Sequence, residues 1–298
     1  MESALRILPC FNQIERITLI ASGLSQHCFK INADNHTYFA KTIDNNTEIT
    51  VATCASNSGL SPNILYYDQQ WLITHFIEAK NLALSTKHID DKLNDSIKLM
   101  AQCHQLTVRP AELSPRDIIN ALLIDSPCSS IQTTELLAFA DLIIMPINDN
   151  KNGVCCHGDL NFSNVLINED QRTWLIDYEC ACTAPIEYDL AMFIAVNELT
   201  DDKTTAIIEQ YQVQSCVSVD PLLLNSYLQF CYLINALWYF NSCHEETHIE
   251  RKHALLKYAE KQWSALQSSL ELGNSTLFNS LSSKLTNILP TLNFKNQT

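Results

Sequence analysis

The most informative segment of the chain is Cys156–Ile167, with the sequence CHGDLNFSNVLI, in which polar residues lie between short apolar runs. A second segment, Trp174–Glu179, has the sequence WLIDYE and again follows an apolar run with carboxylates. The two apolar runs are strand-like and can fold back on each other as an antiparallel pair. Asp159, Asn164 and Asp177 would then converge.

These side chains are the set that phosphoryl transfer from a nucleotide requires. A carboxylate orients and deprotonates the acceptor hydroxyl, and hard oxygen ligands hold the magnesium that bridges the phosphates. Asp and Asn also occupy ordinary turns. The register of Asp159, Asn164 and Asp177 with the flanking apolar runs favours the functional interpretation.

Several motifs together resemble the aminoglycoside phosphotransferase and choline kinase superfamily, and choline/ethanolamine and thiamine kinases are the most similar members. The first motifs are His-x-Asp-x-x-x-x-Asn from His157, Ile-Asp-Tyr-Glu from Ile176 and Tyr-Asp-Leu-Ala from Tyr188. Others fall in family order across residues 15–270: Ser22–Ser25, Ala40-Lys41, Glu48 and Ala101–His104.

The resemblance implies specific roles for the matching residues. Asp159 is expected to be the catalytic base, and Asn164 and Asp177 are expected to hold Mg²⁺. Lys41, paired with Glu48, is expected to contact the phosphates of ATP.

The remaining nucleotide contacts come from the N-terminal part of the chain. By the same resemblance, Gly23 and Ser25 belong to a cofactor-binding loop between two strands. The segment Thr74–Glu78 is expected to hold the adenine through its backbone.

The fold class follows from the resemblance and from the hydrophobic patterns. Strands are predicted at 16–21, 26–32, 37–42, 64–68 and 70–76, and a helix at 47–57. From about residue 79 onward the apolar spacing becomes helical. We therefore expect an α+β, protein-kinase-like fold with a β-rich, nucleotide-binding N-lobe at 1–78. A mainly helical C-lobe at 79–298 would carry the catalytic loop, the metal and the acceptor site, with a hinge near Glu78–Asn81.

Composition limits the other function classes. The 298 residues are 46% hydrophobic and 17% charged, which favours a globular protein. A net charge of −14 disfavours nucleic acid as a partner. No apolar stretch reaches the roughly 20 residues of a membrane span, and no export signal is evident, so we expect a cytoplasmic protein. The oligomeric state stays open.

Some side chains have competing interpretations. The 12 cysteines are expected to be free thiols, although zinc held by Cys155, Cys156, Cys180, Cys182 and His157 is an alternative. His157 is expected to hold the catalytic loop rather than to transfer protons. Asp189 is expected to be a helix cap or a brace for that loop.

Four late aromatics either face a cationic acceptor or pack in the core: Tyr232, Trp238, Tyr239 and Trp263.

The resulting hypothesis is an ATP-dependent, magnesium-requiring kinase. Its substrate would be a small, cationic alcohol such as choline, ethanolamine or thiamine. Two alternatives are an aminoglycoside antibiotic kinase and a noncatalytic protein that binds a nucleotide or metabolite.

Overall fold

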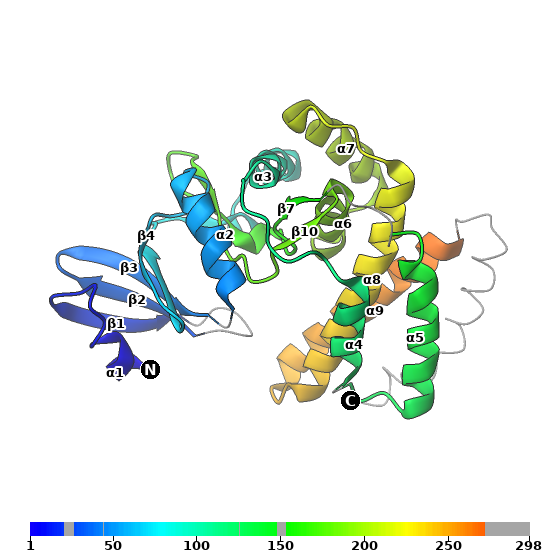
Figure 1. Ribbon diagram of the computed structural model, residues 1–298, viewed down its shortest axis with the longest axis horizontal. Helices are drawn as coiled ribbons and strands as arrows, with labels where there is room; N and C mark the ends of the chain where they lie inside the picture. Colours follow the sequence, from blue (N-terminus) through cyan, green and yellow to red (C-terminus); the bar gives the residue numbers. More distant parts are fainter. Residues whose placement is uncertain (21–26, 44, 125, 148–152, 272–298) are drawn as a thin grey trace. The chain divides into compact units, whose positions relative to one another are not determined.

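The structure is a computed structural model that describes residues 1–20, 27–43, 45–124, 126–147 and 153–271 (Figure 1). The chain forms two compact units. The first contains Met1–Ala111, Val154–Thr183 and Ala206–Val217, and the second contains Glu112–Gly153, Ala184–Thr205 and the chain from Ser218. The expected α+β class, with a small antiparallel N-lobe sheet and a helical C-lobe, is confirmed. The lobe boundary at residue 78 stays a prediction.

The first unit begins with a five-stranded antiparallel sheet in the order β1-β2-β3-β5-β4. Its strands are β1 (Ile14–Ile20), β2 (Cys28–Ala33), β3 (His36–Thr42), β4 (Ile64–Tyr67) and β5 (Trp71–His75). Asp34 and Asn35 form the tight turn between β2 and β3 with φ values of 50° and 62°. Asp and Asn tolerate this left-handed backbone, which suits a two-residue hairpin turn.

The two faces of the sheet have different roles. On β3, Tyr38 and Ala40 are buried on the same face as Leu5 of α1 (Glu2–Leu5). The Asp34 carboxylate accepts 2.9 Å hydrogen bonds from the backbone N–H groups of Asn12 and Gln13, which holds the N-terminal segment in place. Strand alternation turns Lys41 to the opposite face.

Helix α2 (Asn46–Asn57) agrees with the predicted helix at 47–57. The Asn45 side chain caps it by accepting a hydrogen bond of 2.9 Å from the N–H of Glu48. Its buried residues are Glu48, Val51, Ala52 and Ala55. This spacing is that of a single helix face, so Glu48 is buried together with the apolar side chains.

Short strands and helices complete the first unit, including η1 (Leu82–Leu84), α3 (Ile89–His104) and the strand pair of β7 (Val154–Cys156) with β10 (Cys182–Ala184). After η2 (Phe162–Asn164), strands β8 (Val165–Ile167) and β9 (Thr173–Leu175) pair antiparallel, as the sequence predicts. The predicted hinge near Glu78–Asn81 contains β6 (Lys80–Asn81), which pairs with Ile167 and Leu166 of β8. A strand of two residues is too short to show the alternation of buried and exposed side chains by which a sequence pattern reveals a strand.

The second unit is helical. It contains α4 (Pro115–Ile124), α5 (Ser130–Ile144), α6 (Ile186–Val196), the start of α7 (Asp201–Ser215), α8 (Pro221–Glu245) and α9 (Ile249–Glu271). Helices α8 and α9 pack along each other, and Trp263 of α9 is 1% exposed.

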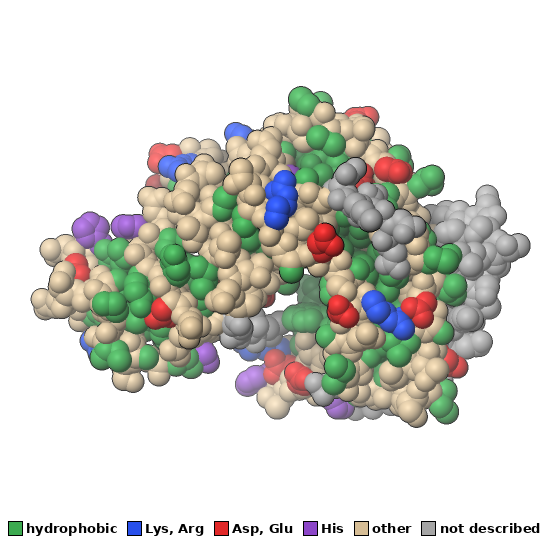
Figure 2. Space-filling view, in the orientation of Figure 1, with side chains coloured by type: hydrophobic (Ala, Val, Ile, Leu, Met, Phe, Trp, Pro, Cys, Tyr) green, Lys and Arg blue, Asp and Glu red, His purple; other side chains and the backbone are tan. Residues whose placement is uncertain are grey.

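Two features concern possible partners: the hydropathy of the helices and the distribution of basic side chains on the surface. Within the part of the chain that the structure describes, no helix combines the length and hydropathy needed to cross a membrane. On the face drawn in Figure 2, the Lys and Arg side chains lie scattered as separate groups.

Candidate active site

The loop between β7 and η2 contains a glycine with a left-handed backbone. Gly158 has a φ of 79°, and a Cβ atom at this position would lie 2.1 Å from the carbonyl oxygen of Cys180. Both the left-handed backbone and the close approach require glycine here. The loop is therefore held directly against the segment that follows Asp177.

His157 supports the loop through both ring nitrogens. Its Nε2 donates to the carbonyl oxygen of Ile176 at 2.9 Å, and its Nδ1 accepts from the N–H of Asp159 at 3.3 Å. The carbonyl partner makes Nε2 the donor, and the N–H partner makes Nδ1 the acceptor. These contacts match the expected loop-holding role, and they engage both nitrogens that a zinc ion would need.

Asp159 and Asn164 contact each other across the loop. The Nδ2 of Asn164 donates to the backbone carbonyl oxygen of Asp159 at 2.9 Å and to its Oδ2 at 3.2 Å. Burial raises the pKa of Asp159, and the nearby charge of Asp177 acts in the same direction. His157 and the hydrogen bonds from Asn161 and Asn164 act in the opposite direction. Because its nitrogen faces these acceptors, Asn164 keeps its amide oxygen for another partner.

Lys41 joins the sheet, α2 and the Asp177 segment. Its Nζ lies 2.5 Å from Glu48 Oε1 and 2.5 Å from Asp177 Oδ1. Lys41 is 7% exposed and Glu48 is 1% exposed. Burial opposes the charge of Lys41, but the carboxylates of Asp177 and Glu48 outweigh it and raise the pKa of Lys41. Asp177 itself has a φ of 74°, which is uncommon outside glycine.

A buried hydroxyl pair anchors the Asp177 segment, and sequence reasoning missed it. Ser61 Oγ lies 2.7 Å from the hydroxyl of Tyr178 and donates to the carbonyl oxygen of Leu175 at 2.7 Å. The N–H of Leu175 in turn donates to the carbonyl oxygen of Leu60 at 2.9 Å. The loop after α2 is thus fastened to the residues that carry Asp177. Only tertiary contacts reveal this link, since Ser61 is distant in sequence.

Glu179 is a further carboxylate that the sequence did not single out as a site residue. Burial, followed by the charge of Asp177, raises its pKa from 4.5 to about 6. The charges of Glu48 and Asp159 act in the same direction, and Lys41 opposes them. The site therefore holds more negative charge than its one described lysine neutralises.

The raised pKa of Glu179 predicts that the stability of the protein depends on pH. Since the pKa of Glu179 rises from 4.5 to about 6 on folding, ionisation of Glu179 destabilises the fold as pH rises through this window. We expect Glu179→Gln to have a higher Tm than the wild type above pH 6 without added metal. The difference should vanish as pH falls toward 4.5. Thermal unfolding across this range, with exposed Glu169→Gln as the control, tests it; a constant difference at all pH values would contradict it.

A cavity of about 450 Å³ lies beside these polar groups. This volume is in the range of small-molecule sites. Apolar side chains from the sheet, α2 and β8 form much of its wall, and Lys41, Glu48, Asn164 and Asp177 also line it. Of the predicted adenine segment, Thr74, His75, Phe76 and Ile77 line it as well.

Other predicted residues have different outcomes. Gly23 and Ser25 lie outside the described residues. The prediction of Asp189 as a helix cap is wrong, because the N-cap of α6 is Pro185 and Asp189 is buried inside the helix.

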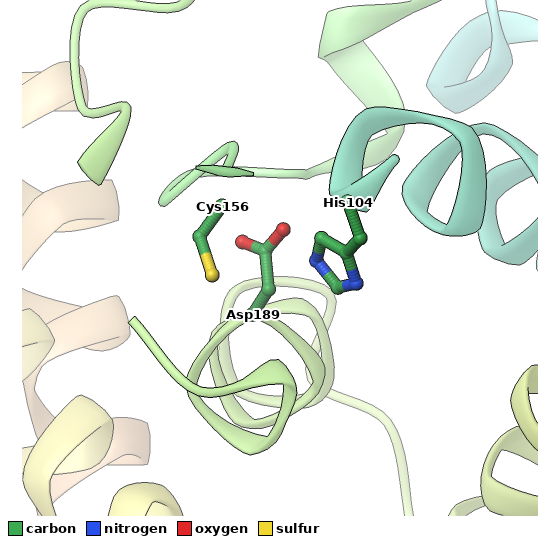
Figure 3. A group of neighbouring side chains, drawn as sticks. All are labelled: His104, Cys156 and Asp189. Carbon is green, nitrogen blue, oxygen red and sulfur yellow. The ribbon is translucent and has the colours of Figure 1, made fainter. Parts of the chain in front are cut away.

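Figure 3 shows His104 at the end of α3, Cys156 on β7 and Asp189 on α6. His104 Nδ1 lies 2.7 Å from the hydroxyl of Tyr211.

The late aromatics separate into core and surface residues. Trp263 is buried in the second unit, whereas Trp238 is 41% exposed. Tyr239 packs edge-on against Trp238, with ring centroids 5.1 Å apart, and stacks on Tyr258 at 5.3 Å. We call Trp238, Tyr239 and Tyr258 the aromatic cluster.

Comparison with known sequences identifies the class of protein. Residues 17–223 match the family described as the phosphotransferase enzyme family. A search of curated proteins gave no match. The chain belongs to the phosphotransferase enzyme family.

Solved structures with the same fold include kinases of small molecules. The choline kinase LicA from Streptococcus pneumoniae is 17% identical with a TM-score of 0.72, covering 90% of this chain and 99% of that one. An ethanolamine kinase from Plasmodium vivax is 14% identical with a TM-score of 0.62, covering 89% and 84%. The spectinomycin phosphotransferase APH(9)-Ia, solved with ADP and spectinomycin, is 14% identical with a TM-score of 0.58, covering 95% and 96%. The protein-kinase-like fold is thereby confirmed.

Proposed function

We propose that this protein is an ATP-dependent, magnesium-requiring kinase that phosphorylates a hydroxyl group of a small, cationic metabolite such as choline, ethanolamine or thiamine. One observation carries the proposal: Asn164, Asp177 and Lys41 line a largely apolar cavity of about 450 Å³, and Asp159 is hydrogen-bonded to Asn164. Family membership supports phosphoryl transfer as the reaction class.

The donor set fits magnesium. The Asp177 carboxylate and the amide oxygen of Asn164 are hard oxygen ligands of the kind that this ion prefers. The ammonium of Lys41 already lies 2.5 Å from Asp177 Oδ1, so the position favours positive charge. Burial raises the pKa values of Asp159 and Glu179, and the nearby charge of Asp177 raises them further. Magnesium held by Asn164 and Asp177 would neutralise charge on the transferring phosphoryl group.

The cavity fits a nucleotide. Its apolar wall suits an adenine, and Thr74–Ile77 of the segment predicted to hold the base line it. Lys41, held in place by Glu48, binds the phosphates, and Gly23 and Ser25 complete the phosphate contacts. ADP bound in the related spectinomycin phosphotransferase supports this assignment.

The reaction requires one proton transfer at Asp159. Its carboxylate orients the acceptor hydroxyl and accepts the proton as the new bond forms between the acceptor oxygen and the γ-phosphorus. The bond from that phosphorus to the oxygen of the leaving ADP breaks. The products are the phosphorylated acceptor and ADP, and the proton then passes from Asp159 to solvent.

Charge supports a cationic acceptor. The net charge of −14 attracts cations over long range. An aminoglycoside is the alternative acceptor, and a noncatalytic nucleotide-binding protein is the alternative outside enzymes.

An ADP-release assay tests the proposed function. The wild type with Mg-ATP is offered choline, ethanolamine, thiamine and an aminoglycoside in turn, with Asp159→Asn as the blank. We expect one of the first three to stimulate ADP release by the wild type alone. Stimulation by the aminoglycoside alone would contradict a small cationic metabolite as the acceptor and would support the aminoglycoside alternative. Nucleotide binding without turnover on any acceptor would support the noncatalytic alternative.

A further inference from the structure

Asn161 lies between Asp159 and Asn164 and makes hydrogen bonds in both directions. Its Oδ1 accepts from the N–H of Ser163 at 2.8 Å and from the N–H of Asn164 at 3.2 Å, which caps η2. Its Nδ2 donates to Asp159 Oδ2 at 3.1 Å. The reversed amide would place its NH₂ against two donors and its oxygen against a carboxylate, so the orientation is fixed.

The hydrogen bonds to the Asp159 carboxylate fall on one oxygen. Both Asn161 Nδ2 and Asn164 Nδ2 donate to Oδ2. Within the described part of the chain, no donor reaches Oδ1 of Asp159. Two donors on one oxygen fix the plane of the carboxylate and draw charge toward Oδ2. Oδ1 is therefore the oxygen left to meet a hydroxyl group.

We propose that Asn161 is a positioning residue that holds Asp159 by Oδ2 and thereby makes Oδ1 the atom that accepts the proton of the acceptor hydroxyl. This inference rests on the proposed kinase function. Asn161 is outside the His-x-Asp-x-x-x-x-Asn residues that carry the family resemblance, and its role follows from its contacts alone. The capping oxygen ties this role to η2, so the same side chain places both Asp159 and Asn164.

Asn161→Asp separates the two contacts. The carboxylate keeps an oxygen for the η2 cap, since Asp caps as well as Asn does, but it loses the donor to Asp159 and repels it. Asn168→Asp is a matched control on the exposed turn between β8 and β9. Asn168 also accepts from a backbone N–H, that of Arg172 at 2.9 Å, and donates to a carboxylate, that of Asp170 at 3.3 Å.

Kinetics supply the first measurement. With the acceptor that the wild type uses, we expect Asn161→Asp to lower kcat by about 10-fold or more, as loss of a positioned base does, with the KM for ATP unchanged. Asn168→Asp should keep the wild-type kcat. A wild-type kcat in Asn161→Asp, or an equal fall in Asn168→Asp, would overturn the positioning role.

A double-mutant cycle of stability decides the inference independently of activity. We expect Asn161→Asp to lower Tm in the wild-type background through repulsion of Asp159, and to leave Tm unchanged in the Asp159→Asn background. An equal change of Tm in both backgrounds would mean that the side chain at position 161 does not act on Asp159, and it would overturn the proposal. If the wild type phosphorylates no acceptor, the proposed function fails while this cycle still decides whether Asn161 holds Asp159.

Discussion

Asp159→Asn is expected to lower turnover with Mg-ATP and the acceptor by about 10²-fold or more, because an amide cannot take the proton from the acceptor hydroxyl. The fold should survive the change. Burial raises the pKa of Asp159, so the folded site disfavours its charge, and a neutral side chain of the same shape removes that cost. We expect a Tm no lower than that of the wild type and an unchanged affinity for nucleotide.

Asp170→Asn is the control for this experiment. Asp170 is an exposed carboxylate on the turn between β8 and β9, and its replacement should leave turnover unchanged. Turnover is measured as ADP release at saturating acceptor. Near-normal turnover in Asp159→Asn would exclude Asp159 as the base and would require another group to accept the proton.

Gly158→Ala is expected to destabilise the protein by about 2–5 kcal/mol. The left-handed backbone costs about 1–2 kcal/mol with a side chain, and overpacking costs about 1–3 kcal/mol. The new methyl group would lie 2.1 Å from the Cys180 carbonyl oxygen, where neither backbone can move freely. Because this contact holds the catalytic loop, any remaining folded protein should have lost most of its turnover.

Gly59→Ala separates the two costs. Gly59 also has a left-handed backbone, with a φ of 76°, but a Cβ atom there would meet nothing within 4 Å. We expect it to lose only about 1–2 kcal/mol. Chemical unfolding of both variants measures the difference. Equal losses would show that the new methyl group at position 158 meets no steric resistance from Cys180.

Short sequence patterns are sufficient to predict elements that depend on local residue preferences, such as the β2–β3 hairpin and helix α2. Asp34 and Asn35 tolerate the left-handed backbone of a hairpin turn, and Asn45 is a helix cap. Helix α1 was missed because the four residues Glu2–Leu5 are too short to show a helical period. It is stable because Leu5 packs against the sheet, which is a tertiary effect.

The site shows the same division. Asp159, Asn164 and Asp177 were singled out because one hairpin carries them within a short stretch of sequence. The sequence does not single out Ser61 or Asn161. A serine in a loop and an asparagine before a turn are common, and only their contacts in the folded protein distinguish these two. Glu179 stands in a recognised motif, yet its raised pKa depends first on burial and then on the carboxylates that the fold gathers around it.

The bridge made by Lys41 has a consequence for the order of ligand binding. Its ammonium acts as a built-in counter-ion that Asp177 shares with Glu48. A divalent ion that approaches Asp177 has to compete with that ammonium. Phosphate oxygens offer Lys41 a different partner, and metal and nucleotide are therefore expected to enter together rather than one after the other.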